Sequence, residues 1–72
     1  MKTPVRVLDV VALLCDQPDR RLLKGDVGTV VEVLAPDVFE VEFLDPSGRT
    51  VAVEELSRDV LLLLRHRVHV AA

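Results

Sequence analysis

The chain has 72 residues, half of them hydrophobic, and a formal net charge of −3 from 9 basic and 12 acidic side chains. This length specifies a single domain, and the acidic balance argues against a protein that grips the phosphate backbone of nucleic acid, which normally carries a basic excess. The single cysteine, Cys15, excludes an internal disulfide and suits a reducing compartment.

Targeting and membrane signals are absent from the sequence. No leader of charge followed by an apolar run opens the chain, and the longest uninterrupted apolar run covers only residues 60–64. A membrane-spanning helix needs roughly 20 apolar residues. We therefore expect a cytoplasmic protein that does not associate with membranes.

The sequence predicts a short N-terminal lead, residues 1–7. The first predicted strand, residues 5–14, begins within this lead. The sequence VRVLDVVALL is rich in β-branched residues and contains no glycine or proline, which favours a strand. As a helix it would be apolar all round, with only two polar residues, a poor amphipathic pattern. In the strand Asp9 is expected to point outward. Val11 and Leu13 share its face and need cover.

A polar loop is predicted for residues 15–23, CDQPDRRLL, with turn chemistry at Pro18. Such a loop is either a solvated connection or a recognition loop that contacts a partner. The candidate recognition residues are Asp16, Asp19, Arg20 and Arg21. No histidine lies near Cys15 in sequence, so nothing marks this thiol as a nucleophile.

A β-hairpin is predicted from residues 27–34 and 38–43, joined by a turn around Pro36. The second strand alternates strictly, with one face made of Phe39, Val41 and Phe43 and the other of Glu40 and Glu42. The apolar face should be buried, while the two glutamates are either solvated or form an acidic docking strip. The first strand is apolar on nearly both faces. Gly28 within it indicates a bulge, a bend or a close backbone approach.

The segment DPSG, residues 45–48, has the signature of a type I turn. It leads into a predicted strand over residues 49–54. Because valine favours strand interiors facing a core, we expect Val51 and Val53 to point inward. The outward face then carries threonine, alanine and glutamate.

Residues 55–60 are too few for a stable α-helix and predict one 3₁₀ turn with Ser57 as its cap. Residues 61–64, four leucines, predict a last short strand. Five short strands, a mixed-charge loop after the first and a 3₁₀ turn before the last form the pattern of a small all-β, five-stranded SH3-like barrel. We assign this domain to residues 8–64.

The C-terminal tail, residues 65–72, contains both histidines, His66 and His69. In a strand these positions point to opposite faces, and too few further ligands exist for the usual metal sites. We therefore predict no metal. The tail is either a frayed terminus or an edge strand that pairs with a neighbouring chain.

Four segments of the chain resemble the bacterial domain-of-unknown-function family 4926. They are DVVALL at residues 9–14, GDVGTVVEV at 25–33, FEVEF at 39–43 and GRT at 48–50. The resemblance covers roughly residues 8–64 and excludes the tail. It implies a small SH3-like barrel encoded by a stand-alone gene, which fits a protein-binding role. It brings no assigned activity, so no functional residues are transferred.

The chain holds more valine and leucine than one small barrel can bury. The candidate interface residues are Val11, Leu13, Val30, Leu34, Leu61 and Leu63. The simplest use of such a patch is a two-fold homodimer, and a cognate protein partner could occupy it instead.

Three classes of function compete. The favoured one is a protein-interaction or accessory module, antitoxin-like or subunit-like. The alternative is a nucleic-acid-binding SH3-like barrel, which the net charge and the lack of aromatic residues for base stacking disfavour. For an enzyme, the sequence lacks a paired acid and base, a nucleophile triad and a phosphate loop. We expect no catalysis, no cofactor and no nucleic-acid partner.

Overall fold

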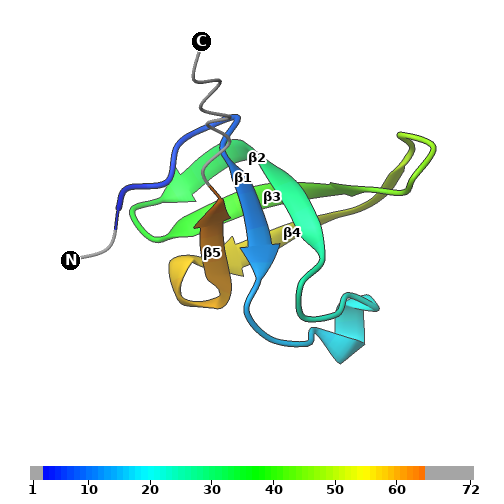
Figure 1. The fold of residues 1–72 in the computed structure, drawn as a ribbon. Coiled ribbons are helices and arrows are strands. Elements are labelled where there is room, and N and C mark those ends of the chain that lie inside the picture. Colours follow the sequence, from blue (N-terminus) through cyan, green and yellow to red (C-terminus); the bar gives the residue numbers. More distant parts are fainter. Residues whose placement is uncertain (1–2, 65–72) are drawn as a thin grey trace, which may run out of the picture.

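Five antiparallel strands form one sheet in a computed structural model that describes residues 3–64 (Figure 1). The strands are β1 (Val10–Leu13), β2 (Val27–Ala35), β3 (Val38–Leu44), β4 (Thr50–Ser57) and β5 (Leu61–Leu64). Two 3₁₀ helices, η1 (Pro18–Arg20) and η2 (Arg58–Val60), complete the secondary structure. The predicted all-β fold class is confirmed.

The sheet has the order β4-β3-β2-β1-β5 and curls around its own core (Figure 1). The predicted 3₁₀ turn before the last strand is present as η2, and the Ser57 side chain caps it by accepting from the backbone N–H of Asp59 at 3.2 Å. No ladder joins β4 to β5 among the described residues, so the sheet is not closed. No helix within residues 3–64 is long and apolar enough to cross a membrane.

The core is built on the alternating strand β3. Phe39, Val41 and Phe43 are almost completely buried, as their period-two spacing predicted. Aliphatic side chains from the other elements surround them; these are Val5, Val11, Leu13, Leu22, Val30, Leu56 and Leu61. The N-terminal segment belongs to this core through Val5. The fold therefore begins within the segment predicted as a lead.

Strand β1 begins at Val10, five residues later than predicted. The preceding residues form a tight turn, in which the N–H of Asp9 donates to the carbonyl of Arg6 at 3.0 Å. The Asp9 carboxylate in turn accepts from the N–H of Arg6 at 2.8 Å, so this side chain closes the turn and does not lie on a strand face. Leu8 takes a left-handed φ of 75° within the turn. Since Asp9 does not mark the outer face, Val11 and Leu13 point into the core.

Strand β2 approaches β3 closely at Gly28 and then bulges. A Cβ atom at Gly28 would lie 2.6 Å from Cγ1 of Val41, so the predicted close approach is confirmed at this glycine. The register shifts between Val30 and Glu32, which leaves Val31 as the extra residue of a β-bulge. The bulge reverses the alternation of β2.

The predicted orientation of β4 is wrong. Val51 and Val53 are exposed, whereas Ala52 packs against the core and Leu56 is buried. The register explains this, because Ala52 lies opposite Phe43 on the inner face. The small alanine leaves room for the phenyl ring, and the register slips at the end of the ladder, where Val51 is the unpaired extra residue.

The turn at residues 45–48 forms as predicted. The N–H of Gly48 donates to the carbonyl of Asp45 at 2.9 Å, and Gly48 has a φ of 87°. Oδ1 of Asp45 accepts from the N–H and the hydroxyl of Ser47 and from the N–H of Arg49, at 2.6–2.9 Å. The hydrogen bond from the Ser47 hydroxyl, followed by that from Arg49, lowers the pKa of Asp45 below its ordinary value of 3.8.

Candidate interaction surface

Four of the six predicted interface residues are core residues. The side chains of Val11, Leu13, Val30 and Leu61 are at most 2% exposed and pack against one another inside the sheet. They offer no surface to a partner, so the predicted interface is corrected at these positions. The remaining two differ: Leu34 is exposed at the end of β2, and Leu63 is partly buried against the core.

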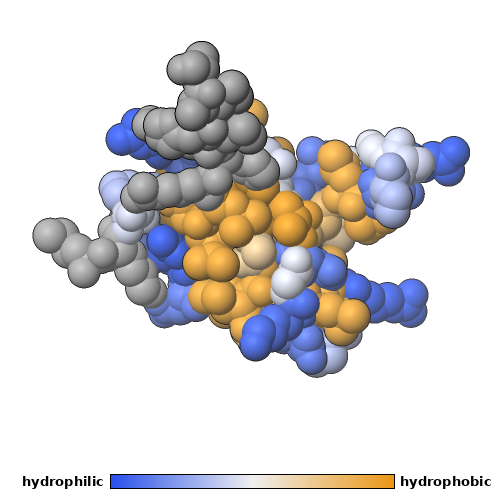
Figure 2. Space-filling view, in the orientation of Figure 1, coloured by the Kyte–Doolittle hydropathy of each residue, from blue (hydrophilic) through white to orange (hydrophobic). Residues whose placement is uncertain are grey.

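On β5, β1 and β2, the apolar side chains that alternate with the core residues cover the outer side of the sheet. We call this set the outer apolar face; it comprises Val10, Ala12, Leu14, Val27, Leu62 and Leu64. None of these six belongs to the core cluster or packs against it as a partly buried neighbour. Figure 2 shows the apolar side chains gathered over β1 and β5, with hydrophilic residues below them.

The strand register defines the rows of this face. One row runs Leu62, Ala12, Val27, and the next runs Leu64, Val10, Thr29, each across β5, β1 and β2. Neither row contains a charged residue. The outer side of β2, β3 and β4 is different, because one row there consists of three glutamates, Glu32, Glu40 and Glu55.

The middle residue of the first row, Ala12, is nearly buried. The side chain of Ala12 is 9% exposed, whereas its cross-strand neighbours Leu62 and Val27 are 50% and 51% exposed. A short side chain thus lies between two longer ones that project from the sheet. In this row the outer apolar face is therefore exposed at Leu62 and Val27 and nearly closed at Ala12.

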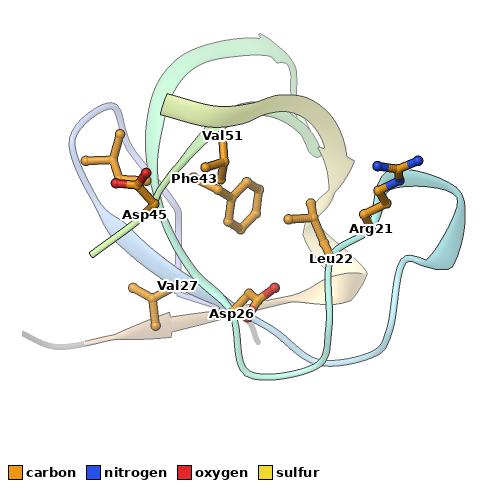
Figure 3. Close-up of a pocket in the computed structure, with 8 residues that line it drawn as sticks. Arg21, Leu22, Asp26, Val27, Phe43, Asp45 and Val51 are labelled. Carbon is orange, nitrogen blue, oxygen red and sulfur yellow. The ribbon is translucent and has the colours of Figure 1, made fainter. Parts of the chain in front are cut away.

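A pocket of about 240 Å³ adjoins this face at Val27 (Figure 3). Its lining is Arg21, Leu22, Asp26, Val27, Phe43, Leu44, Asp45 and Val51. The ring of Phe43 and the side chain of Leu22 point toward one another in its centre, and Val51 reaches it from the bulge in β4 (Figure 3). The pocket is apolar inside and carries charged groups of both signs around it.

Comparison with known proteins identifies the family. A family model described as a domain of unknown function, DUF4926, matches residues 7–63, which include every strand except the last residue of β5. The chain belongs to the DUF4926 family. No curated protein and no solved structure matches the chain.

The predicted recognition loop of this DUF4926 domain is fastened to the sheet. Nη1 of Arg20 donates to the carbonyl of Glu55 at 3.1 Å, and its Nε lies 3.6 Å from a carboxylate oxygen of Glu54. Oδ1 of Asp16 accepts from the N–H of Lys24 at 2.8 Å. Two of the four predicted recognition residues thus hold the loop in place.

The other two predicted recognition residues lie on η1 and after it. Asp19 is in the first turn of this helix, which the sequence had presented as irregular loop. Arg21 ends η1 with a left-handed φ of 57° and lines the pocket (Figure 3). Cys15 is a free, exposed thiol whose sulfur lies 3.4 Å from Nε2 of Gln17.

Within residues 3–64 of the DUF4926 domain, no group of three or more His, Cys, Asp or Glu side chains is placed to hold a metal ion. His66 and His69, with the rest of the tail over residues 65–72, lie outside the described residues. The outer apolar face is the feature that sequence reasoning missed. The sequence did indicate two apolar faces, since β1 and β5 are apolar at every position. The prediction placed the buried residues of these strands on the outer face and the outer residues in the core.

Proposed function

We propose that this protein is a protein-interaction or accessory module that docks a protein partner on its outer apolar face. The observation that carries the proposal is the uncharged apolar surface spread over three adjacent strands, β5, β1 and β2. Large contiguous apolar patches on small soluble domains mark interaction sites. An antitoxin-like or subunit-like role in the cytoplasm is the specific form that we propose.

The energetics support a covered surface. Burying a leucine or valine side chain is worth about 1.5–3 kcal/mol. Leu62 and Val27 are each about half exposed to water in the isolated chain. For a domain of this size, whose total stability is of the order of 5–15 kcal/mol or less, cover by a partner is a large gain.

The charge distribution supports a protein partner over nucleic acid. The net charge is −3, and the glutamate row on β2, β3 and β4 would repel phosphates. Arg20, a basic residue of the predicted recognition loop, is already engaged with Glu54 and Glu55. Catalysis is not part of the proposal, because it rests on a surface and on no reactive group.

The test is affinity capture from the native host followed by mass spectrometry, using the wild type and two lysine variants. Leu62→Lys places a charge on the outer apolar face, and Val53→Lys places one on an exposed strand position outside it. We expect captured proteins that Leu62→Lys loses and Val53→Lys keeps, with both variants folded by circular dichroism. If Leu62→Lys captures the same proteins as the wild type, the proposal is contradicted. Nucleic acid recovered with a steep salt dependence would support the alternative function.

A further inference from the structure

We infer that the pocket lined by Leu22, Phe43 and Val51 is a binding site for a small organic cation, an ammonium or guanidinium group on a short apolar stem. The inference goes beyond the proposed function, because it concerns a small molecule and a different part of the surface. Of the six residues of the outer apolar face, only Val27 lines the pocket. The lining, the size and the charge of the pocket carry the inference.

The interior of the pocket is apolar. Leu22 and Phe43, both at most 5% exposed, form its floor, and their side chains point toward one another (Figure 3). Val27, Leu44 and Val51 stand around this floor and are each 50–59% exposed. Pockets with an apolar lining and a few polar groups at their edge are the usual sites for small molecules. The stem of a ligand would therefore be apolar.

The size of the pocket limits the length of that stem. Its volume is about 240 Å³, which is smaller than the roughly 300–1,000 Å³ of pockets for drug-sized ligands. It has room for roughly eight groups of the size of a water molecule, each of which occupies about 30 Å³ in the liquid. A few carbon atoms with one head group fit this space.

Two carboxylates at the pocket select the charge of the head group. Oδ2 of Asp26 accepts from the N–H of Leu23, and Oδ1 of Asp45 accepts the hydrogen bonds of its own turn. Within residues 3–64 the second oxygen of each accepts no hydrogen bond, and neither carboxylate forms an ion pair. The hydrogen bonds of the turn lower the pKa of Asp45, so this group is ionised at neutral pH. A cation is the complement of both carboxylates.

Arg21 is the basic residue of the lining and does not reverse this preference. Its guanidinium has no hydrogen bond or ion pair within the described residues. It lies beyond Leu22, on the side away from Asp26 and Asp45 (Figure 3). Two acidic side chains thus stand against one basic side chain, in a chain whose net charge is −3. The local field and the overall field both favour a cation over an anion.

The experiment is an NMR titration of the purified full chain at neutral pH and low salt, followed through the backbone amides. The probes are pentylammonium, 1-pentanol and pentanoate, which are similar in size and differ in charge. We expect pentylammonium to shift the amides of Asp26, Val27 and Leu44 saturably. Its dissociation constant should lie in the millimolar range, because exposed charge pairs contribute weakly. Pentanoate should bind at least roughly threefold more weakly than pentylammonium.

Two matched pairs of variants locate the site. Asp26→Asn keeps an oxygen that can accept from Leu23 but loses the charge, and should weaken pentylammonium binding by roughly threefold. Asp37→Asn removes the same charge at an exposed residue that does not line this pocket, and should leave binding unchanged. Val51→Phe fills the pocket and should abolish binding of every probe. Val53→Phe, at an exposed position of the same strand outside the pocket, should not.

Several outcomes overturn the inference. They are the absence of saturable shifts at high millimolar pentylammonium, equal binding of pentanoate, and binding that survives Val51→Phe. Equal weakening by Asp37→Asn and Asp26→Asn would also overturn it, since the pocket carboxylate would then have no special part. If Asp26→Asn is not folded, the three probes and the two phenylalanine variants decide. Leu62 does not line the pocket, so protein capture that is insensitive to Leu62→Lys would contradict the proposed function alone.

Discussion

Gly28 and Val41 face each other across β2 and β3 at a distance that only glycine permits. A Cβ atom added to Gly28 would lie 2.6 Å from Cγ1 of Val41 and 2.8 Å from the carbonyl oxygen of Glu42. Gly28 is also paired in register with Phe43, whose ring lies against it at 3.0 Å from the same position. The glycine therefore lets two large core side chains lie over the β2 backbone.

We expect Gly28→Ala to destabilise the fold by about 1–3 kcal/mol, the usual cost of overpacking a core. Urea unfolding followed by circular dichroism measures this. Val41→Ala removes part of the clash, so the double variant should lose less free energy of unfolding than the two single variants added together. Strict additivity would mean that Val41 does not limit the space at Gly28.

The orientation of β4 predicts an unequal pair of alanine substitutions. Leu56→Ala opens a cavity beside Phe39, its register partner, and should cost about 2–5 kcal/mol. Val53→Ala alters an exposed side chain on the other face and should change stability by less than about 0.5 kcal/mol. Equilibrium unfolding of the two variants compares them directly. The reverse ranking would restore the orientation that the valine pattern suggested.

The turn before β1 predicts a stabilising substitution. Leu8 is 75% exposed and has a φ of 75°, at the third position of a turn closed by Asp9 and Arg6. Relief of the left-handed conformation is worth about 1–2 kcal/mol, and the added freedom of glycine in the unfolded chain offsets about 0.4–1 kcal/mol of it. Leu8→Gly should therefore raise the free energy of unfolding by roughly 1 kcal/mol. Val7→Gly is the control; it is exposed without a positive φ and should lower stability.

The turn at Asp45 predicts a pH-dependent contribution to stability. The folded state lowers the pKa of Asp45 from 3.8, chiefly through the Ser47 hydroxyl, so the unfolded chain binds this proton more readily. The contribution is complete above pH 3.8 and is lost as the pH falls through the lower folded-state value. The stability difference between the wild type and Asp45→Asn should therefore be constant near neutral pH and shrink below 3.8.

Thermal unfolding at a series of pH values measures that difference. Ser47→Ala removes the hydroxyl that is the main cause of the shift, and the pH-dependent part should be smaller in its background. A difference that stays constant down to strongly acidic pH would mean that the carboxylate charge plays no part in the turn.

The sequence by itself determined the number of strands and the 3₁₀ turn before the last of them. Alternation in Phe39, Val41 and Phe43 fixes the buried face of β3, because side chains of a strand point to its two sides in turn. The DPSG turn and the Ser57 cap depend on neighbouring residues only, so local sequence is sufficient for them. The family resemblance, predicted over residues 8–64, is of the same kind, and the match over residues 7–63 confirms it.

Only the tertiary structure decided which face of the two-sided apolar strands is buried. In β1 and β5 every position is apolar, so hydrophobicity does not distinguish the two parities, and a shift of one residue exchanges the faces. The turn closed by Asp9 sets the phase of β1, and pairing with β1 sets that of β5. Bulges at Val31 and Val51 shift the phase again within β2 and β4. The outer apolar face at Ala12 and Leu62 thus follows from contacts between strands, which the linear pattern does not record.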